Sequence, residues 1–125
     1  MKIKVGMYIR TEKGIAKIIN IFPDGSEPYS EAKYETDTYL EIYYDSQYVS
    51  EYDIIKASFD IINLIEYNDY VNGERIVDVI PVEVCGDELL DNQHIFTADG
   101  EIYENEIKSI VTKEQFEQMS YKVGD

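Results

Sequence analysis

The sequence is poor in the residues on which several protein classes depend. Among its 125 residues there is one cysteine, one histidine and no tryptophan. The single cysteine, Cys85, excludes a disulfide within the chain, so nothing in the composition points to secretion. With Cys85 and His94 as its only thiol and imidazole, one chain lacks the four nitrogen or sulfur ligands of a structural zinc site.

Basic residues are also scarce. The chain has 11 Lys and Arg residues against 26 Asp and Glu residues, which gives a formal net charge of −15. Direct binding to nucleic acid or to an anionic membrane needs clustered Lys and Arg, so the charge argues against both. The acidity suits either a basic protein partner or simple solubility.

Long apolar runs are missing as well. No run reaches the length that crosses a membrane, and the N-terminal MKIKVGMYIR is too short and too interrupted for a signal peptide. We therefore expect a soluble, cytoplasmic protein. Apolar residues make up 44% of the chain, which is enough for a buried core.

Motifs for catalysis and for phosphate binding are absent. Neither GxxxxGK[ST] nor GxGxxG occurs. Cys85 and His94 have no orienting or oxyanion motif beside them, and we interpret them as a strand end and a loop residue. The acids around residues 87–91 and 99–101 lack the spacing of a calcium loop. We expect no enzyme, no cofactor and no metal.

The sequence does contain a clear pattern of β-strands. Apolar and polar residues alternate over residues 2–10, which is typical of a half-buried strand. A turn at Thr11–Gly14 and a β-branched run at residues 15–21 predict a hairpin. Further extended segments are expected at 38–44, 48–49, 75–84 (with a bend or edge at Pro81), 95–96 and 102–103.

The second half of the chain repeats the order of strand and turn signals found in the first half. Residues 67–71 match residues 5–9, and Gly73 matches Gly14 after a tighter turn. Residues 106–109 match residues 53–58, with a register uncertain by one residue. The pattern predicts an internal duplication, with repeats at residues 1–60 and 61–125 or one fused domain.

A short helix is expected at the end of the second repeat. Thr112 and Gln115 have the spacing of a capping box. Phe116 and Met119 lie on one side of such a helix, where they would cover one end of a barrel.

Two resemblances follow from these segments. The stretch VGMYIRTEKGIAKI and its return to Ile21 resemble the first hairpin of SH3-like barrels of the KOW, Tudor and CarD kind. The resemblance implies a mainly β fold of two tandem SH3-like small barrels with a short C-terminal α-helix. An SH3-like fold serves many functions and identifies none of them.

The wider chain resembles small uncharacterised proteins of phages, prophages and gut Firmicutes. The likeness is carried by KIKVGMYIRTEKGIAKI, IIKASFDIINLIEYNDYVNG and IKSIVTKEQFEQMSYKV. It implies a viral or mobile-element setting, in the cytoplasm of an infected bacterium. It implies no reaction and no functional residue.

Acidic residues and tyrosines gather in two parts of the chain. Residues 24–60 hold ten acids, two bases and seven of the twelve tyrosines, and residues 83–106 hold eight acids and no base. Tyrosine gives a flat contact area with a polar tip, and carboxylates among aromatic rings suit a partner rich in Arg and Lys. The alternative is that these tyrosines are ordinary strand residues, above all Tyr39 and Tyr43.

The favoured function is a non-enzymatic counter-defence inhibitor, anti-CRISPR-like or directed at a nuclease. Its acidic, Tyr-rich surface would occupy the basic nucleic-acid channel of a host defence protein, with carboxylates in place of phosphates. The expected contact residues are Tyr29, Glu31, Tyr34, Glu35, Asp37, Tyr48, Asp87, Glu88 and Asp91.

Two other functions remain open. The chain could sequester a nucleotide immune signal, in a pocket between repeats or between subunits of a homo-oligomer. The residues expected to bind such a ligand are Arg10, Lys17, Tyr43 and Arg75. The third possibility is an SH3-like adaptor or regulatory module, which only the first hairpin supports.

Overall fold

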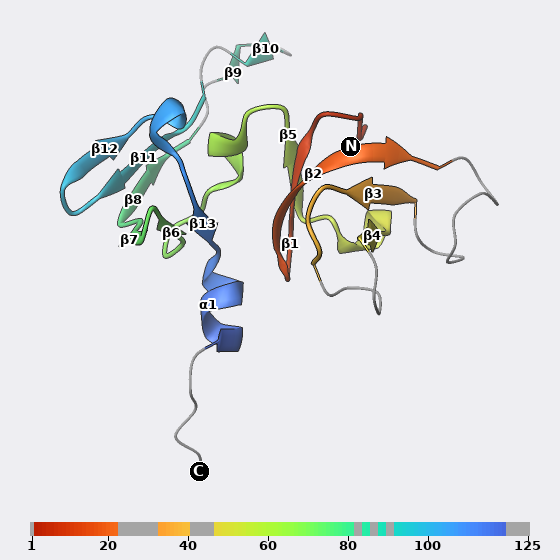
Figure 1. The fold of residues 1–125 in the computed structure, drawn as a ribbon. Coiled ribbons are helices and arrows are strands. Elements are labelled where there is room, and N and C mark those ends of the chain that lie inside the picture. The colour runs from red at the N-terminus through yellow and green to blue at the C-terminus, as the bar shows by residue number, and fades with distance from the viewer. Residues whose placement is uncertain are drawn as a thin grey trace. The chain divides into compact units, whose positions relative to one another are not determined.

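The computed structural model describes residues 2–22, 33–40, 47–81, 84–85, 88–89 and 92–119. Short antiparallel strands dominate, and one α-helix, α1 (Lys113–Met119), follows the last of them (Figure 1). The mainly β class predicted from the sequence, with a short helix near the C-terminus, is confirmed. The chain divides into two compact units, unit 1 (Met1–Leu64) and unit 2 (Ile65–Asp125).

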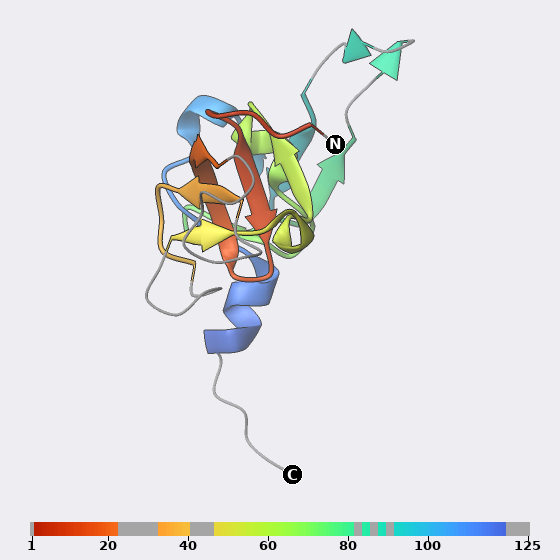
Figure 2. The ribbon, with the colours of Figure 1, turned by 90° about the vertical axis from the view of Figure 1, so that its right-hand side faces the viewer.

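Unit 1 is built on a five-stranded antiparallel sheet in the order β4-β3-β2-β1-β5 (Figure 2). Its strands are β1 (Tyr8–Thr11), β2 (Gly14–Ile21), β3 (Tyr34–Thr36), β4 (Tyr48–Val49) and β5 (Lys56–Ser58). Two short 3-10 helices, η1 (Glu51–Asp53) and η2 (Ile61–Leu64), lie on either side of β5 in the sequence.

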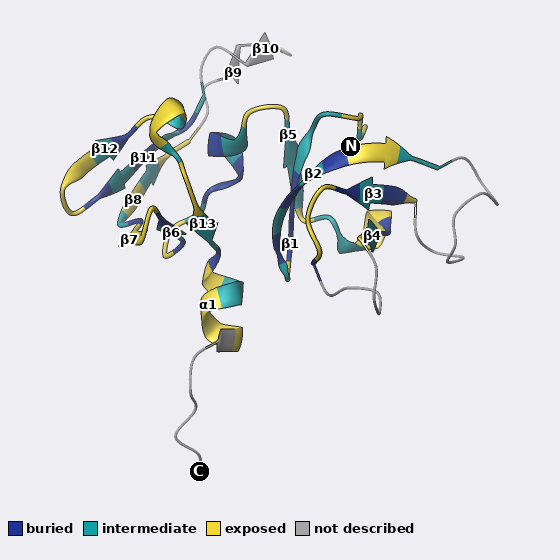
Figure 3. Cartoon of the chain, in the orientation of Figure 1, coloured by how far each residue is buried: buried dark blue, intermediate teal, exposed yellow. Residues whose placement is uncertain are grey.

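The core of unit 1 follows from the alternation seen in its sequence. Ile9 on β1 pairs with Ala16 on β2, and both side chains are buried together with Ile18. A β-bulge after Ile18 turns Ile19 out to solvent, so the buried part of β2 ends there (Figure 3). The remaining buried members of the cluster are Tyr34, Leu40 and Val49.

Unit 2 contains smaller sheets. Their strands are β6 (Tyr70–Val71), β7 (Glu74–Arg75), β8 (Asp78–Ile80), β9 (Val84–Cys85), β10 (Glu88–Leu89), β11 (His94–Thr97), β12 (Gly100–Ile102) and β13 (Ile110–Val111). The orders are β13-β6-β7, β12-β11-β8 and β10-β9, and the 3-10 helix η3 (Glu104–Glu106) precedes β13.

The two units share one strand order. In unit 1 the first strand pairs with the second and with the last, and the third strand pairs with the second and the fourth. In unit 2, β6 takes the place of β1, and β7 and β8 together take the place of β2. The places of β3, β4 and β5 are taken by β11, β12 and β13, in that order. Each unit also has a 3-10 helix immediately before its last strand.

The turn that enters each first strand is the same down to single hydrogen bonds. In unit 1 the Met7 amide donates to the Lys4 carbonyl (3.1 Å), and the Gly6 amide donates to the Ile18 carbonyl (2.9 Å). Gly6 has a positive φ of 95°, which glycine adopts without strain.

Unit 2 has the equivalent turn 62 residues later in the chain. The Asp69 amide donates to the Glu66 carbonyl (3.1 Å), and the Asn68 amide donates to the Ile76 carbonyl (3.0 Å). Asn68 has a φ of 74°, at the position that Gly6 fills in unit 1. This agreement of topology and turn geometry is independent support for the duplication inferred from the sequence.

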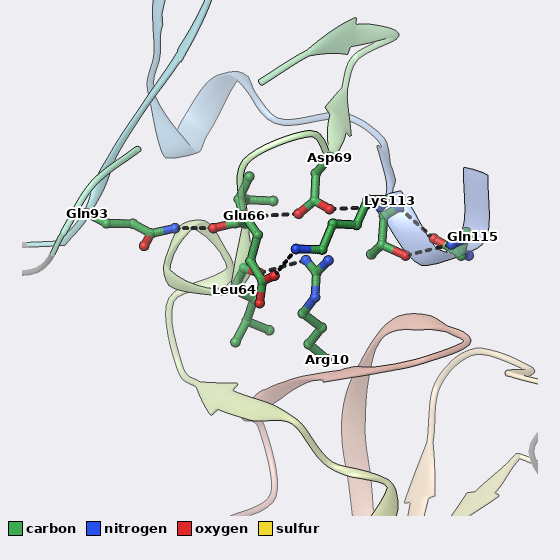
Figure 4. Close-up of polar contacts among 9 residues, drawn as sticks. Arg10, Leu64, Glu66, Asp69, Gln93, Lys113 and Gln115 are labelled. Carbon is green, nitrogen blue, oxygen red and sulfur yellow. Dashed lines mark hydrogen bonds and ion pairs between the residues drawn. The ribbon is translucent and has the colours of Figure 1, made fainter. Parts of the chain in front are cut away.

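Asp69 has an additional role in unit 2. Its buried carboxylate accepts hydrogen bonds from the Glu66 amide (2.6 Å) and from the Lys113 amide (2.9 Å), which ties the start of α1 to the entry turn (Figure 4). The Lys113 ammonium also pairs with the Glu66 carboxylate at 2.8 Å. The predicted capping box is confirmed, because Thr112 and Gln115 each accept the other's backbone amide.

Two strand predictions are wrong in part. Residues 38–40 are not in a strand, and residues 41–44 lie outside the described residues; the strand in this part of the chain is β3. The run at residues 75–84 is interrupted after β7, because Val77 donates its amide to Phe96 and the chain changes from the β6 sheet to the β11 sheet. Barrel closure stays a prediction, since no pairing of β4 with β5 is present among the described residues.

Candidate functional site

A hollow lies on the surface of unit 2. Its volume is about 180 Å³, and four carboxylic acids line it: Glu74, Asp99, Glu101 and Glu106. The other lining residues, Asn72, Thr97, Gly100 and Ile102, carry no charge. We call this feature the acidic hollow.

Three short segments bring the four acids together. Glu74 begins β7, directly after the turn at Asn72 and Gly73; Asp99 and Glu101 belong to the β11–β12 hairpin. Glu106 is the last residue of η3. Asn72 joins the first segment to the third, because its side-chain amide donates to the Glu106 carbonyl at 2.8 Å.

Local hydrogen bonds fix the turns that carry these acids. The Thr97 hydroxyl oxygen accepts from the Asp99 amide (3.1 Å) and donates to the Gly100 carbonyl (3.4 Å). One carboxylate oxygen of Glu106 accepts from the Tyr103 amide at 2.8 Å, which closes the start of η3. The acids are therefore held on ordered backbone.

The carboxylates of the hollow affect one another. The pKa of Glu74 is raised above its ordinary value of 4.5, chiefly by a side-chain hydrogen bond with Asp99, and further by desolvation and by the charge of Asp99. Carboxylates that line one hollow repel one another and give it a negative local potential. A cation that enters the hollow would relieve this repulsion.

Glu101 has a further neighbour. The Nδ1 atom of His94 on β11 lies 2.6 Å from the Glu101 carboxylate. His94 is therefore not an isolated loop residue, as the sequence suggested, but a strand residue beside the acidic hollow.

Unit 1 presents one tyrosine that the sequence-based site did not include. Tyr52, in the middle of η1, is 87% exposed. Ser50 and Asp53 hold the turn rigid, since the Asp53 carboxylate accepts from the Ser50 amide (2.8 Å) and the Ser50 hydroxyl accepts from the Tyr52 amide (3.2 Å). The Ser-x-x-Asp spacing is a capping box that could have revealed this turn in the sequence.

The predicted partner-binding residues of unit 1 divide into two groups. Tyr34 is wrong as a contact residue, because its side chain belongs to the buried core. Glu35 and Tyr48 are half-buried and face each other across β3 and β4, and the Tyr48 ring lies 5.7 Å from that of Phe22. Asp37 is exposed, and its carboxylate accepts the Lys17 amide at 2.9 Å.

The other predicted contacts are not placed by the structure. Tyr29, Glu31, Asp87 and Asp91 lie outside the described residues, and Glu88 is described only as a backbone position of β10. The clustering expected for these residues therefore stays a prediction.

Unit 1 does not bring together the residues predicted to bind a nucleotide ligand. Arg10 is wrong as a ligand contact, because it is fully buried and its guanidinium donates to the Leu64 carbonyl at 3.0 Å (Figure 4). The Lys17 ammonium lies 5.7 Å from the centroid of the Tyr8 ring. Tyr43 lies outside the described residues.

Arg75 belongs to unit 2, at the position equivalent to Lys17. Each pairs with the first residue of its unit's first strand, Tyr70 and Tyr8 respectively. The Arg75 guanidinium donates to the Asn68 side chain at 2.9 Å, so it supports the entry turn.

Two kinds of feature are missing from the part of the chain that the structure describes. Within the described ranges, no group of three or more His, Cys, Asp or Glu residues is arranged to hold a metal ion. No helix in the same part of the chain is long and apolar enough to cross a membrane.

Comparisons with known proteins give no identity. No known protein family, no curated protein and no solved structure matches the chain. Function has to be argued from the chain's own residues.

Proposed function

We propose that the chain is a non-enzymatic binding protein whose acidic hollow receives a Lys or Arg side chain of a basic partner. The observation that carries the proposal is the lining of the hollow, which has four carboxylic acids and no basic residue. A guanidinium group fits such a site well, because its planar donors can bind two carboxylate oxygens at once.

The charge of unit 2 supports the same function. Unit 2 holds fifteen of the 26 acidic residues but only four of the 11 basic residues. A field of one sign over a small unit attracts a basic partner and accelerates its association. The hollow would then supply the specific contact at the end of that approach.

The biological setting we propose is phage counter-defence, and its support is the sequence resemblance alone. A host nuclease or CRISPR effector has a basic channel for nucleic acid, and clustered carboxylates can occupy it in place of phosphates. The protein would act in the cytoplasm of the infected bacterium. Nucleotide sequestration is the weaker alternative, because Arg10 is buried and unavailable to a phosphate.

The test measures binding of a nona-arginine peptide by calorimetry at low salt. The variant Glu74→Gln/Asp99→Asn removes two of the four carboxylic acids of the hollow. The control is Asp60→Asn/Glu117→Gln, since it makes the same charge change at exposed positions outside the hollow. We expect the first variant to bind about tenfold more weakly, because a charge-assisted hydrogen bond contributes about 1.5–3 kcal/mol.

The control variant distinguishes binding at the hollow from attraction by the net charge of the protein. If both variants lose the same affinity, the peptide responds only to net charge and the hollow is not the site. If only the hollow variant loses affinity, capture of host proteins at low and high salt becomes the way to identify the natural partner.

A further inference from the structure

The charge of the acidic hollow depends on the only histidine of the chain. His94 Nδ1 and Glu101 Oε2 are 2.6 Å apart, and Glu101 lines the hollow. Phe96 is the direct partner of Glu101 across β11 and β12, so His94 reaches Glu101 from the diagonal position on the same face of the ladder. In the part of the chain that the structure describes, none of the other three carboxylates of the hollow forms an ion pair.

We propose that His94 is a pH-dependent switch of the acidic hollow. Protonated, it neutralises Glu101 and weakens the binding of a cationic partner; neutral, it leaves the full charge of Glu101 to that partner. This inference rests on the proposed function, because it concerns the regulation of the same site. Histidine suits the role since its charge ordinarily changes between pH 5 and 8.

The charged groups that face His94 from the strands paired with β11 are acidic. On β8, the residue opposite His94 is Ile80, and Asp78 lies on the same face opposite Phe96. On β12, the facing charged group is Glu101. Both described charged groups are acidic, and both favour the protonated imidazole.

The position of Glu101 makes the switch effective. Its side chain is 24% exposed and that of His94 is 42% exposed, so both remain accessible to protons and to a partner. A partner's guanidinium and the His94 imidazolium would compete for one carboxylate. Binding of the partner should therefore release a proton from His94 when the pH is below neutrality.

The first measurement uses the free protein. An NMR titration of the His94 imidazole is recorded for the wild type and for Glu101→Gln, with Asp78→Asn as a comparison. We expect the midpoint in Glu101→Gln to be lower than in the wild type, because the neutral amide no longer stabilises the imidazolium. The same midpoint in both proteins would show that the pair does not exist in solution, and would overturn the proposal without reference to any partner.

The second measurement is the affinity of the nona-arginine peptide at pH 5.5 and pH 8. The wild type should gain about two- to fivefold in affinity at the higher pH, the range expected of one partly exposed ion pair. With its N-terminus acetylated, the peptide has no group that titrates in this range, so the change belongs to the protein. In His94→Gln this gain should be lost, because no imidazole then pairs with Glu101.

The outcomes distinguish the switch from the function on which it rests. If the peptide requires the hollow but shows the same pH dependence in His94→Gln as in the wild type, the switch is wrong and the proposed function stands. If the peptide does not require the hollow at either pH, the proposed function fails and the switch falls with it.

Discussion

At the scale of single residues, environment decides what a side chain does, and residue type alone does not. Tyr34 and Tyr52 lie in the same Tyr-rich part of the chain, yet one is packed in the core of unit 1 and the other is 87% exposed. Arg10 was a reasonable candidate for a phosphate, but its guanidinium is turned to a carbonyl 54 residues away. Such long-range partners leave no signal in the local sequence.

The two tyrosines provide a direct test of this assignment. Tyr34→Ala should lower the free energy of unfolding by about 3 kcal/mol or more, because it leaves a large cavity in the core. Tyr52→Ala should change it by less than about 0.5 kcal/mol. Urea denaturation followed by circular dichroism measures both. Equal losses in the two variants would contradict the placement of Tyr34.

The carboxyl pair of the hollow gives a prediction about pH. Because the pKa of Glu74 is raised, the folded state holds this proton more tightly than the unfolded state does. The pair therefore stabilises the fold below pH 4.5, and the contribution is lost as the pH rises through the folded pKa of Glu74. Carbon-13 NMR titration of Glu74 should show its pKa falling towards 4.5 in Asp99→Asn. An unchanged pKa would show that the hydrogen bond to Asp99 is not its cause.

At the scale of elements, the parts predicted correctly are those governed by local rules. The first hairpin, the α1 capping box and the match of residues 67–71 to residues 5–9 all depend on spacings of a few residues. The acidic hollow could not be predicted in this way. Its acids come from β7, the β11–β12 hairpin and η3, and only the fold brings those segments together.

The turn between β6 and β7 is the element with the sharpest local requirement. Asn72 and Gly73 both have positive φ, of 54° and 83°, as a two-residue type I′ hairpin turn needs. Gly73→Ala should destabilise unit 2 by about 1 kcal/mol, although a Cβ there meets no atom within 4 Å, because the backbone conformation disfavours alanine. Gly73→Asn should cost less, since asparagine tolerates this conformation. Thermal unfolding measures both, and equal stability of Gly73→Ala and the wild type would contradict the turn assignment.

At the scale of the whole molecule, the two units share a topology and differ in the side chains that it carries. The two units keep one strand order and one entry turn, yet Glu74 and Glu101 of the hollow correspond to Ala16 and Tyr48 in unit 1. Repetition of a fold keeps its backbone geometry while the side chains at equivalent positions change, even at Ala16, which is buried in unit 1. In unit 2, four acids line one hollow.

The net charge of −15 leads to a prediction for the entire chain. Self-repulsion destabilises a compact state, and salt screens it over a Debye length of about 8–10 Å at 0.1–0.15 M. The melting temperature should therefore rise between 20 and 500 mM NaCl, by about 4–8 °C for each 1 kcal/mol of repulsion removed from a unit of this size. KCl should have the same effect, because screening depends on ionic strength.

Over the same range the affinity for the nona-arginine peptide should fall, since screening weakens attraction and repulsion alike. A melting temperature that fell with salt would mean that favourable ion pairs outweigh the repulsion between the acids, and that the acidic field we assign to partner binding is already neutralised within the chain.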